Sequence, residues 1–164
     1  MAEETLIEFI RHGEPEGGSK YRGHGIDDPL TELGWTQMWE GIGNADHWDI
    51  ILSSPLARCA DFARRLGADR GIRVRIMDDL REIGFGAWEG MTKEQLLEQR
   101  AEEFRRFYED PIANPPEPGM SRTDVVRGFL AASAAIGDDL GLGGGAVDAF
   151  WSQTSLSPTT LQLQ

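Results

Sequence analysis

The sequence predicts an α/β fold with a largely parallel sheet. Three short segments have the apolar, β-branched character of strands, and segments with apolar residues at helical spacing lie between them. Strands that alternate with helices are typical of layered domains, because each helix packs its apolar side on the sheet. With 164 residues, of which 40% are apolar, the chain is long enough for one sizeable core. A single domain is therefore expected over residues 1–136.

The first expected strand is Thr5–Ile10, which is too short for a typical helix and ends abruptly at Arg11. Its nearly continuous apolar character indicates a strand that is buried in a parallel sheet. The second expected strand is Asp49–Leu52, which is also short and apolar. The third is Arg73–Met77, where arginine alternates with apolar residues and one side should be more exposed.

Two helices are expected between these strands. The first begins after Thr31, a good N-cap, and its apolar residues recur at helical spacing as far as Ile42. The second follows Ser53-Ser54-Pro55, where a serine cap precedes proline at the first helical position. Its end is expected near Gly67 or Gly71, because glycine is common just after a helix.

Two further helices and a tail complete the expected organisation. Thr92–Gln95 fits a capping box at the start of a long helix that ends before Pro111. Ser121 can cap a last clear helix that runs to Ile136. From residue 137 the chain is rich in glycine and then in Ser, Thr and Gln, without a steady pattern. Residues 137–164 are therefore expected to form an atypical, irregular tail.

Charge and cysteine content argue against several classes of protein. Sixteen basic and 28 acidic side chains give a net charge of −12, which repels nucleic acid and anionic lipid, so neither partner is expected. The single cysteine, Cys59, allows no internal disulfide and is best interpreted as a small buried apolar residue. No apolar run approaches the roughly 20 residues of a membrane span, and no basic leader is visible, so a cytoplasmic location is expected.

Arg11 and His12 follow the first strand directly, at the edge where parallel α/β sheets bind their ligands. A neutral imidazole is a competent nucleophile toward phosphorus, and a guanidinium group offers a planar fork of donors that matches phosphate oxygens. The pair therefore suits phosphoryl transfer. A capping or surface histidine is the alternative for Arg-His-Gly taken alone, so the wider context has to decide.

Other side chains supply that context. Arg58 follows the second strand at the start of a helix, where the helix terminus and the guanidinium can both stabilise an anion, although a solvated first-turn residue is an equal alternative. Arg22, in the loop after His12, could close over a substrate. A leaving alkoxide needs a proton, and a partly buried carboxylic acid such as Glu82 can supply it; an exposed carboxylate is the alternative there.

Taken together, four ordered motifs resemble the histidine phosphatase superfamily, in the branch that includes cofactor-dependent phosphoglycerate mutases. The motifs are Arg11–Glu14, Leu30–Gln37, Ser53–Arg58 and Glu82–Gly90. The resemblance implies a phosphoglycerate mutase-like, three-layer α/β/α sandwich. It also implies catalytic roles for four residues. His12 would form a phosphohistidine that water hydrolyses, Arg11 and Arg58 would hold phosphate oxygens, and Glu82 would protonate the leaving group and later activate water. No metal or other cofactor is implied.

Within the family, the chain most resembles bacterial small phosphatases of the α-ribazole phosphate phosphatase type, which act in cobalamin synthesis. The residues that carry this resemblance are Arg11–Pro15, Tyr21-Arg22-Gly23, Phe85–Gly90 and the loop Asp110–Gly119. It implies a small phosphorylated metabolite as substrate, with α-ribazole 5′-phosphate as one candidate. Gly23 and His24 join Arg11, Arg22 and Arg58 as expected substrate-binding residues. The short region from Glu82 to Thr123 leaves little room for the extra segment of glycolytic mutases, which favours a phosphatase over a mutase.

The chain departs from the family pattern at a second active-site histidine, which relatives carry in a His-Gly pair after a late strand. Only His12, His24 and His47 are present; His24 lies in the loop near the site, and His47 is interpreted as structural. Losing a preorganised donor costs about 2.7–4 kcal/mol of transition-state stabilisation, or about 100- to 1000-fold in rate. A naturally divergent end and a change of reading frame both explain the tail, and the abrupt loss of pattern favours the second.

Two alternatives to a phosphatase therefore remain at the level of sequence. One is a catalytically weak domain that binds phosphorylated ligands or protein partners through the same arginines. The other is a phosphotransferase of the phosphoglycerate mutase type. The oligomeric state is not determined by the sequence.

Overall fold

The computed structural model describes residues 5–110, 113–116 and 159–163. In chain order the elements are β1 (Thr5–Phe9), α1 (Glu32–Ile42), β2 (Ile50–Ser53), α2 (Ala57–Arg70), β3 (Arg73–Ile76), the 3-10 helices η1 (Asp78–Leu80) and η2 (Gly86–Trp88), α3 (Lys93–Gln99), α4 (Ala101–Glu109) and β4 (Thr159–Leu163). Strands alternate with helices as the sequence predicted, and the α/β class is confirmed. The helix expected from Ser121 to Ile136 lies outside the described residues, and the division of the chain at residue 136 stays a prediction.

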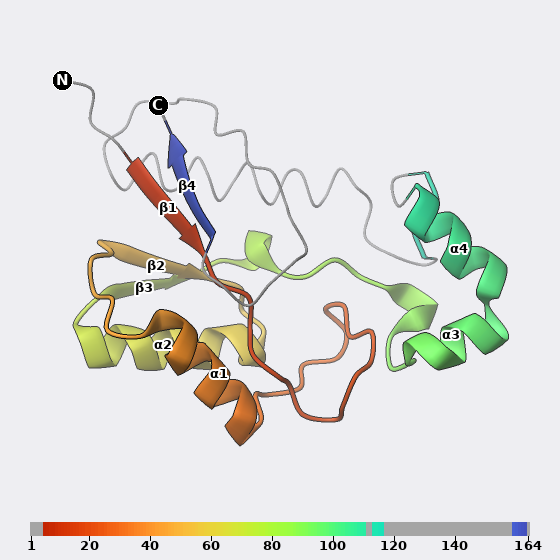
Figure 1. Ribbon diagram of the computed structural model, residues 1–164, viewed down its shortest axis with the longest axis horizontal. Coiled ribbons are helices and arrows are strands. Elements are labelled where there is room, and N and C mark those ends of the chain that lie inside the picture. Colours follow the sequence, from red (N-terminus) through yellow and green to blue (C-terminus); the bar gives the residue numbers. More distant parts are fainter. Residues whose placement is uncertain (1–4, 111–112, 117–158, 164) are drawn as a thin grey trace.

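The parallel part of the sheet is formed by β2 and β3. Ile50 lies opposite Arg73 and Ser53 lies opposite Ile76, so the two strands run in the same direction in simple register. Helix α2 connects them, and α1 and α2 lie on the same side of this pair (Figure 1). Both strands are close to the segments that the sequence predicted.

Strand β1 differs from the prediction in its partner. It pairs antiparallel with β4, with Thr5 opposite Leu163 and Phe9 opposite Thr159, and Figure 1 shows the two strands side by side. The expectation that this segment is buried in a parallel sheet is wrong, because Phe9 and Ile10 are each 42% exposed. Strand β4 also lies where an irregular tail was expected. Its short Thr-Thr-Leu-Gln-Leu sequence has β-branched residues and alternating leucines, which favour a strand despite the polar surroundings.

The helix ends show which local sequence signals were sufficient to predict where a helix begins. Thr31 caps α1 by accepting a hydrogen bond from the Gly34 backbone N–H, and Thr92 and Gln95 form the expected capping box of α3. The single long helix expected after Thr92 is instead two helices, because the backbone leaves the helical conformation at Arg100, with φ −141° and ψ 35°. That segment contains neither glycine nor proline. The bend lets Phe104 of α4 pack in the same cluster as Leu96 of α3.

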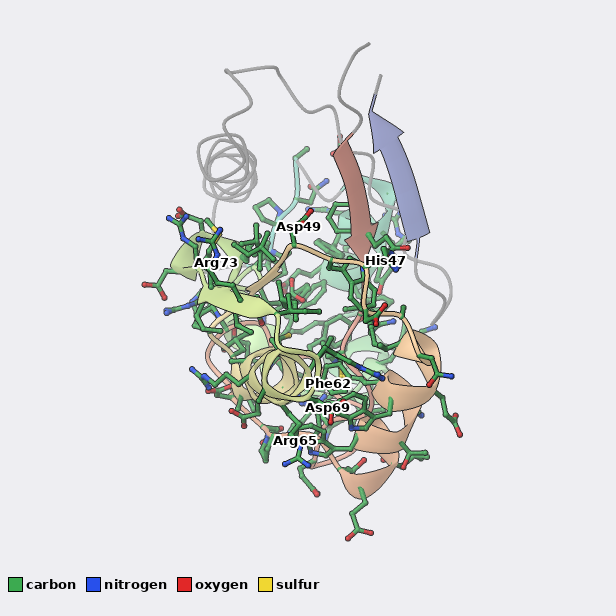
Figure 2. All side chains as sticks on the ribbon, turned by 90° about the vertical axis from the view of Figure 1, so that its left-hand side faces the viewer. His47, Asp49, Phe62, Arg65, Asp69 and Arg73 are labelled. Atoms are coloured by element: carbon green, nitrogen blue, oxygen red, sulfur yellow. The ribbon has the colours of Figure 1, made fainter. Side chains whose placement is uncertain are left out.

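Two separate hydrophobic cores hold the described part together. The first lies between α1 and α2, where Phe62 packs against Trp35 and Trp39 with ring centroids 5.7 and 4.9 Å apart. Figure 2 shows Phe62 pointing from α2 toward α1, whereas Arg65 lies on the outer side of α2. The buried members of this first core are Leu30, Met38, Ile42, Phe62 and Leu66.

We call the second core the aromatic cluster; it joins η2 to α3 and α4. Its members are Tyr21, Phe85, Trp88, Met91, Leu96, Phe104 and Phe107. Trp88 is fully buried, and its Nε1 donates a hydrogen bond of 2.6 Å to Glu103. The loop between β1 and α1 contributes Tyr21 to this cluster and Leu30 to the first core, so it spans both. Among the described helices, none is long and apolar enough to cross a bilayer.

Candidate active site

The backbone around His12 is fixed by close contact with the first turn of α1. A Cβ atom on Gly13 would lie 2.2 Å from the Gly34 carbonyl oxygen, and a Cβ atom on Gly34 would lie 2.1 Å from that of Glu14. Both positions therefore require glycine. The Glu14 N–H also donates a hydrogen bond of 2.9 Å to the side chain of Gln37 on α1. These contacts hold the residue that follows β1 in one place.

The ring of His12 is held in the form that a nucleophile needs. Its Nδ1 lies 2.8 Å from the Gly13 carbonyl oxygen, and because a carbonyl can only accept, Nδ1 carries the proton and Nε2 keeps its lone pair. Burial lowers the pKa of His12 below its ordinary value of 6.5, and the charges of Arg58, Arg11 and Arg22 lower it further, against the effect of the Gly13 hydrogen bond. The imidazole is therefore neutral at pH 7, with three arginines close enough to influence it.

Arg58 is a buried cation with unused donors. It is 2% exposed, its Nη2 donates to the Gly23 carbonyl at 2.8 Å, and its Nη1 donates to the Ile26 carbonyl at 3.1 Å. Its buried Nε has no hydrogen-bond partner, and none of the ion pairs among the described residues involves it. The alternative of a solvated first-turn residue is therefore wrong. A buried guanidinium group without a counter-charge is strongly unfavourable, and no carboxylate of the described residues forms an ion pair with Arg58.

The start of α2 contributes less to anion binding than the sequence suggested. The helix begins at Ala57, not Pro55, and its first N–H donates a hydrogen bond of 2.6 Å to the side chain of Asp27. The predicted serine cap is wrong, since Leu56 occupies the N-cap position and has no side-chain cap. Sequence patterns missed Asp27, because it comes from a loop far from α2 in the chain. Its carboxylate already occupies the first donor that a phosphate would use there.

Arg22 is directed into its own loop. It is 8% exposed, and its Nε donates to Asp28 at 3.0 Å. Its Nη1 donates to the Lys20 carbonyl, and its Nη2 donates to the carbonyls of Glu16 and Gly18, at 2.5 to 3.1 Å. Four of the five guanidinium N–H groups are thus engaged within the loop. Closure of Arg22 over a substrate stays a prediction, while in this structure the side chain holds the loop together.

The turn at residues 23–26 connects Arg58 to the segment that carries Glu82. His24 donates from Nδ1 to the Glu82 carbonyl oxygen, 3.2 Å away, and the half-buried Glu82 carboxylate accepts from the Ile83 N–H. Burial raises the pKa of the Cys59 thiol to about 11; nearby Arg58 lowers it, and the charge of Glu82 raises it. Glu82 therefore lies near the first turn of α2, and Cys59 is a half-buried thiol that is neutral at pH 7.

A second link joins the loop to the same segment through Tyr21, whose packing role the sequence did not predict. Its N–H donates to the Met91 carbonyl at 2.9 Å, its carbonyl accepts from Gly90 at 2.7 Å, and its hydroxyl lies 2.7 Å from that of Tyr108 on α4. The loop is thereby attached to the aromatic cluster beside the site. Within the described ranges, no group of three or more His, Cys, Asp or Glu side chains is placed to hold a metal ion.

Comparison with known proteins places this geometry in a family. Residues 7–140 match the histidine phosphatase superfamily, branch 1. Phosphoserine phosphatase 1 of Hydrogenobacter thermophilus is 35% identical over 128 residues, which cover 74% of this chain and 61% of the relative. A mycobacterial glucosyl-3-phosphoglycerate phosphatase has a similar structure, with a TM-score of 0.73 and 30% identity, covering 88% of this chain and 69% of that one.

The alpha-ribazole phosphatase from Shigella flexneri is also similar, with a TM-score of 0.70 and 27% identity, covering 84% of this chain and 69% of that one. The chain spans between 35% and 61% of the length of four curated relatives that it matches. These neighbours confirm the phosphoglycerate mutase-like fold. The chain belongs to the histidine phosphatase superfamily.

Proposed function

We propose that this chain is a phosphomonoester hydrolase that works through a phosphohistidine at His12. The observation that carries the proposal is the pairing of a neutral imidazole with Arg58, a buried guanidinium group that forms no ion pair with any described residue. A phosphate ester supplies the missing negative charge and places phosphorus next to the nucleophile. Arg11, which is exposed beside His12, provides a second cation for the same group.

The reaction takes two steps. In the first, Nε2 of His12 attacks phosphorus, the bond from phosphorus to the ester oxygen breaks, and the leaving alkoxide takes a proton from Glu82. In the second, Glu82 removes a proton from water, which attacks the phosphohistidine and releases inorganic phosphate. Arg11 and Arg58 balance the charge on the oxygens in both transition states. Gly23 and His24 are proposed to contact the substrate from the turn beside Arg58.

The proposed substrate is a small phosphorylated metabolite. The relatives named above act on phosphoserine, glucosyl-3-phosphoglycerate and alpha-ribazole phosphate, according to their names. All three are small phosphate esters, so α-ribazole 5′-phosphate, and with it a role in cobalamin synthesis, is one substrate to test. The net charge of −12 argues against a nucleic-acid partner, and the cytoplasm is the proposed location.

The decisive experiment measures hydrolysis of p-nitrophenyl phosphate by the wild type and by His12→Ala. Loss of turnover to the background rate is expected for His12→Ala, with a phosphohistidine detectable only in the wild type. His47→Ala is the matched control, because His47 is an exposed histidine bound to Glu8 on β1 (Figure 2). Turnover that survives His12→Ala would contradict the proposal.

A second candidate is a domain that binds phosphorylated ligands with little turnover. It is proposed as the alternative because no His-Gly pair follows Arg58 within residues 1–164. Phosphate binding that depends on Arg58, together with a rate that His12→Ala leaves unchanged, would support it. A mutase differs from both, because it moves the phosphoryl group within the substrate and releases no inorganic phosphate.

A further inference from the structure

The carboxylate of Glu89 lies directly against the turn that supports Arg58. A Cβ atom on Gly23 would lie 2.1 Å from Oε1 of Glu89, and a Cβ atom on Gly25 would lie 2.0 Å from Oε2. Oε1 also accepts a hydrogen bond of 3.0 Å from the Phe85 N–H. One oxygen is therefore anchored to the segment that follows Glu82, while both oxygens contact a turn whose two glycines leave room for them.

This turn supports two groups of the proposed site. Its carbonyls at Gly23 and Ile26 accept the two hydrogen bonds that orient the Arg58 guanidinium group. Its His24 side chain donates to the backbone of Glu82. Gly23 has a φ of 53°, so the carbonyl that binds Arg58 depends on a conformation that other residues rarely adopt. A shift of the turn would therefore move the phosphate-binding cation relative to the acid.

We propose that Glu89 is a positioning residue whose side chain holds the turn at residues 23–26 against Arg58. Glu89 acts through its shape and through the hydrogen bond that it accepts from Phe85, so an amide of the same size can replace the carboxylate. The charge of Glu89 takes no part in proton transfer. The effect on turnover rests on the proposed phosphatase function, whereas the effect on the turn does not.

The first test compares Glu89→Ala, Glu89→Gln and the control Glu98→Ala, which removes an exposed glutamate on α3. Misplacement of a binding group by about 1 Å typically costs about 100-fold, so Glu89→Ala is expected to lower kcat/KM for p-nitrophenyl phosphate by about that factor. The inhibition constant for inorganic phosphate should rise in parallel, because Arg58 binds the phosphate itself. Glu89→Gln should restore both values. A Glu89→Gln variant as defective as Glu89→Ala would overturn the proposal.

The second test uses the contact between Glu89 and Gly25. Gly25→Ala places a methyl group on Oε2 of Glu89, whereas Glu89→Asp withdraws the carboxylate by one methylene and leaves room for that methyl group. Gly25→Ala should therefore be much less damaging in the Glu89→Asp background than in the wild type, as expected for residues in contact. Effects that simply add would rule out the proposed contact. The Gly25→Ala and Glu89→Asp variants also test whether Glu89 contacts the turn if Glu89→Ala fails to fold.

A third measurement is independent of turnover. Cys59 is the only cysteine, is half-buried next to Arg58 in α2, and lies close enough to Glu82 and Asp27 to feel their charges. Loosening the turn should increase the rate at which 5,5′-dithiobis(2-nitrobenzoic acid) labels this thiol in Glu89→Ala, but not in Glu89→Gln or Glu98→Ala. Equal labelling rates in all of them would contradict the positioning role. An inactive wild type would contradict only the proposed function.

Discussion

Replacement of Arg58 by lysine tests the phosphate-binding role of the guanidinium group most directly. The substitution keeps the positive charge but exchanges five N–H donors for three. Two donors of Arg58 bind the carbonyls of Gly23 and Ile26, which leaves three for a phosphate. A lysine that satisfied both carbonyls would keep only one. Loss of two charge-assisted hydrogen bonds, each worth about 1.5–3 kcal/mol, lowers transition-state stabilisation by about 3–6 kcal/mol.

That loss corresponds to a fall in kcat/KM of about 150- to 25,000-fold. The assay is steady-state hydrolysis of p-nitrophenyl phosphate, with urea denaturation of each variant to show that it is folded. Arg64→Lys is the matched control, because Arg64 lies on the exposed side of the same helix and pairs only with Asp61 in the described structure. A folded Arg58→Lys variant that kept kcat/KM close to the wild-type value would refute the assignment of Arg58 to the phosphate.

Three further predictions follow from the described contacts. Burial and the nearby arginines lower the pKa of His12, so the acid limb of the kcat/KM profile should lie below pH 6.5, and a limb above pH 6.5 would contradict this prediction. As the pH falls below 6.5, the imidazole of His12 is protonated in the unfolded chain before it is protonated in the folded chain, so its contribution to stability is lost. Trp88→Ala should lower the free energy of unfolding by about 3–5 kcal/mol in urea titrations, since Trp88 is fully buried, and a loss within error of zero would contradict its place in the core. Arg22→Met should make residues 14–29 more sensitive to limited proteolysis than the exposed control Arg65→Met does, since it removes four hydrogen bonds within the loop; equal cleavage would argue against its role there.

Sequence patterns predicted those elements whose stabilising contacts are local. The caps of α1 and α3 were recognised because Thr31 and Thr92 bind backbone groups only three residues away. The antiparallel pairing of β1 was not predicted, since it depends on a partner that is distant in the sequence, and the bend at Arg100 was not predicted because that segment has neither glycine nor proline. An apolar run indicates a strand, but it does not identify the strand that pairs with it.

The same distinction explains which site residues the sequence revealed. His12 and Arg58 follow the ends of β1 and β2, and Arg58 lies beyond the parallel pair of β2 and β3, where the topology of parallel sheets makes polar residues informative. Asp27 and Glu89 were missed because an isolated carboxylate in an acidic chain is most often solvated. Their partners lie far away in sequence: Ala57 for Asp27, and the turn at residues 23–26 for Glu89. Only the folded arrangement brings Asp27 to the start of α2 and Glu89 to the turn whose carbonyls bind Arg58.

The presence of two separate hydrophobic cores has a consequence for the dynamics of the molecule. Among the described residues, helices α3 and α4 are held through the aromatic cluster and share no buried member with the core between α1 and α2. Cooperative units that share few contacts can open one at a time. Amide protons of α3 and α4 should then exchange with deuterium through a sub-global opening that leaves those of α2 protected. Since Tyr21 belongs to the aromatic cluster, such an opening would also release the loop that follows His12.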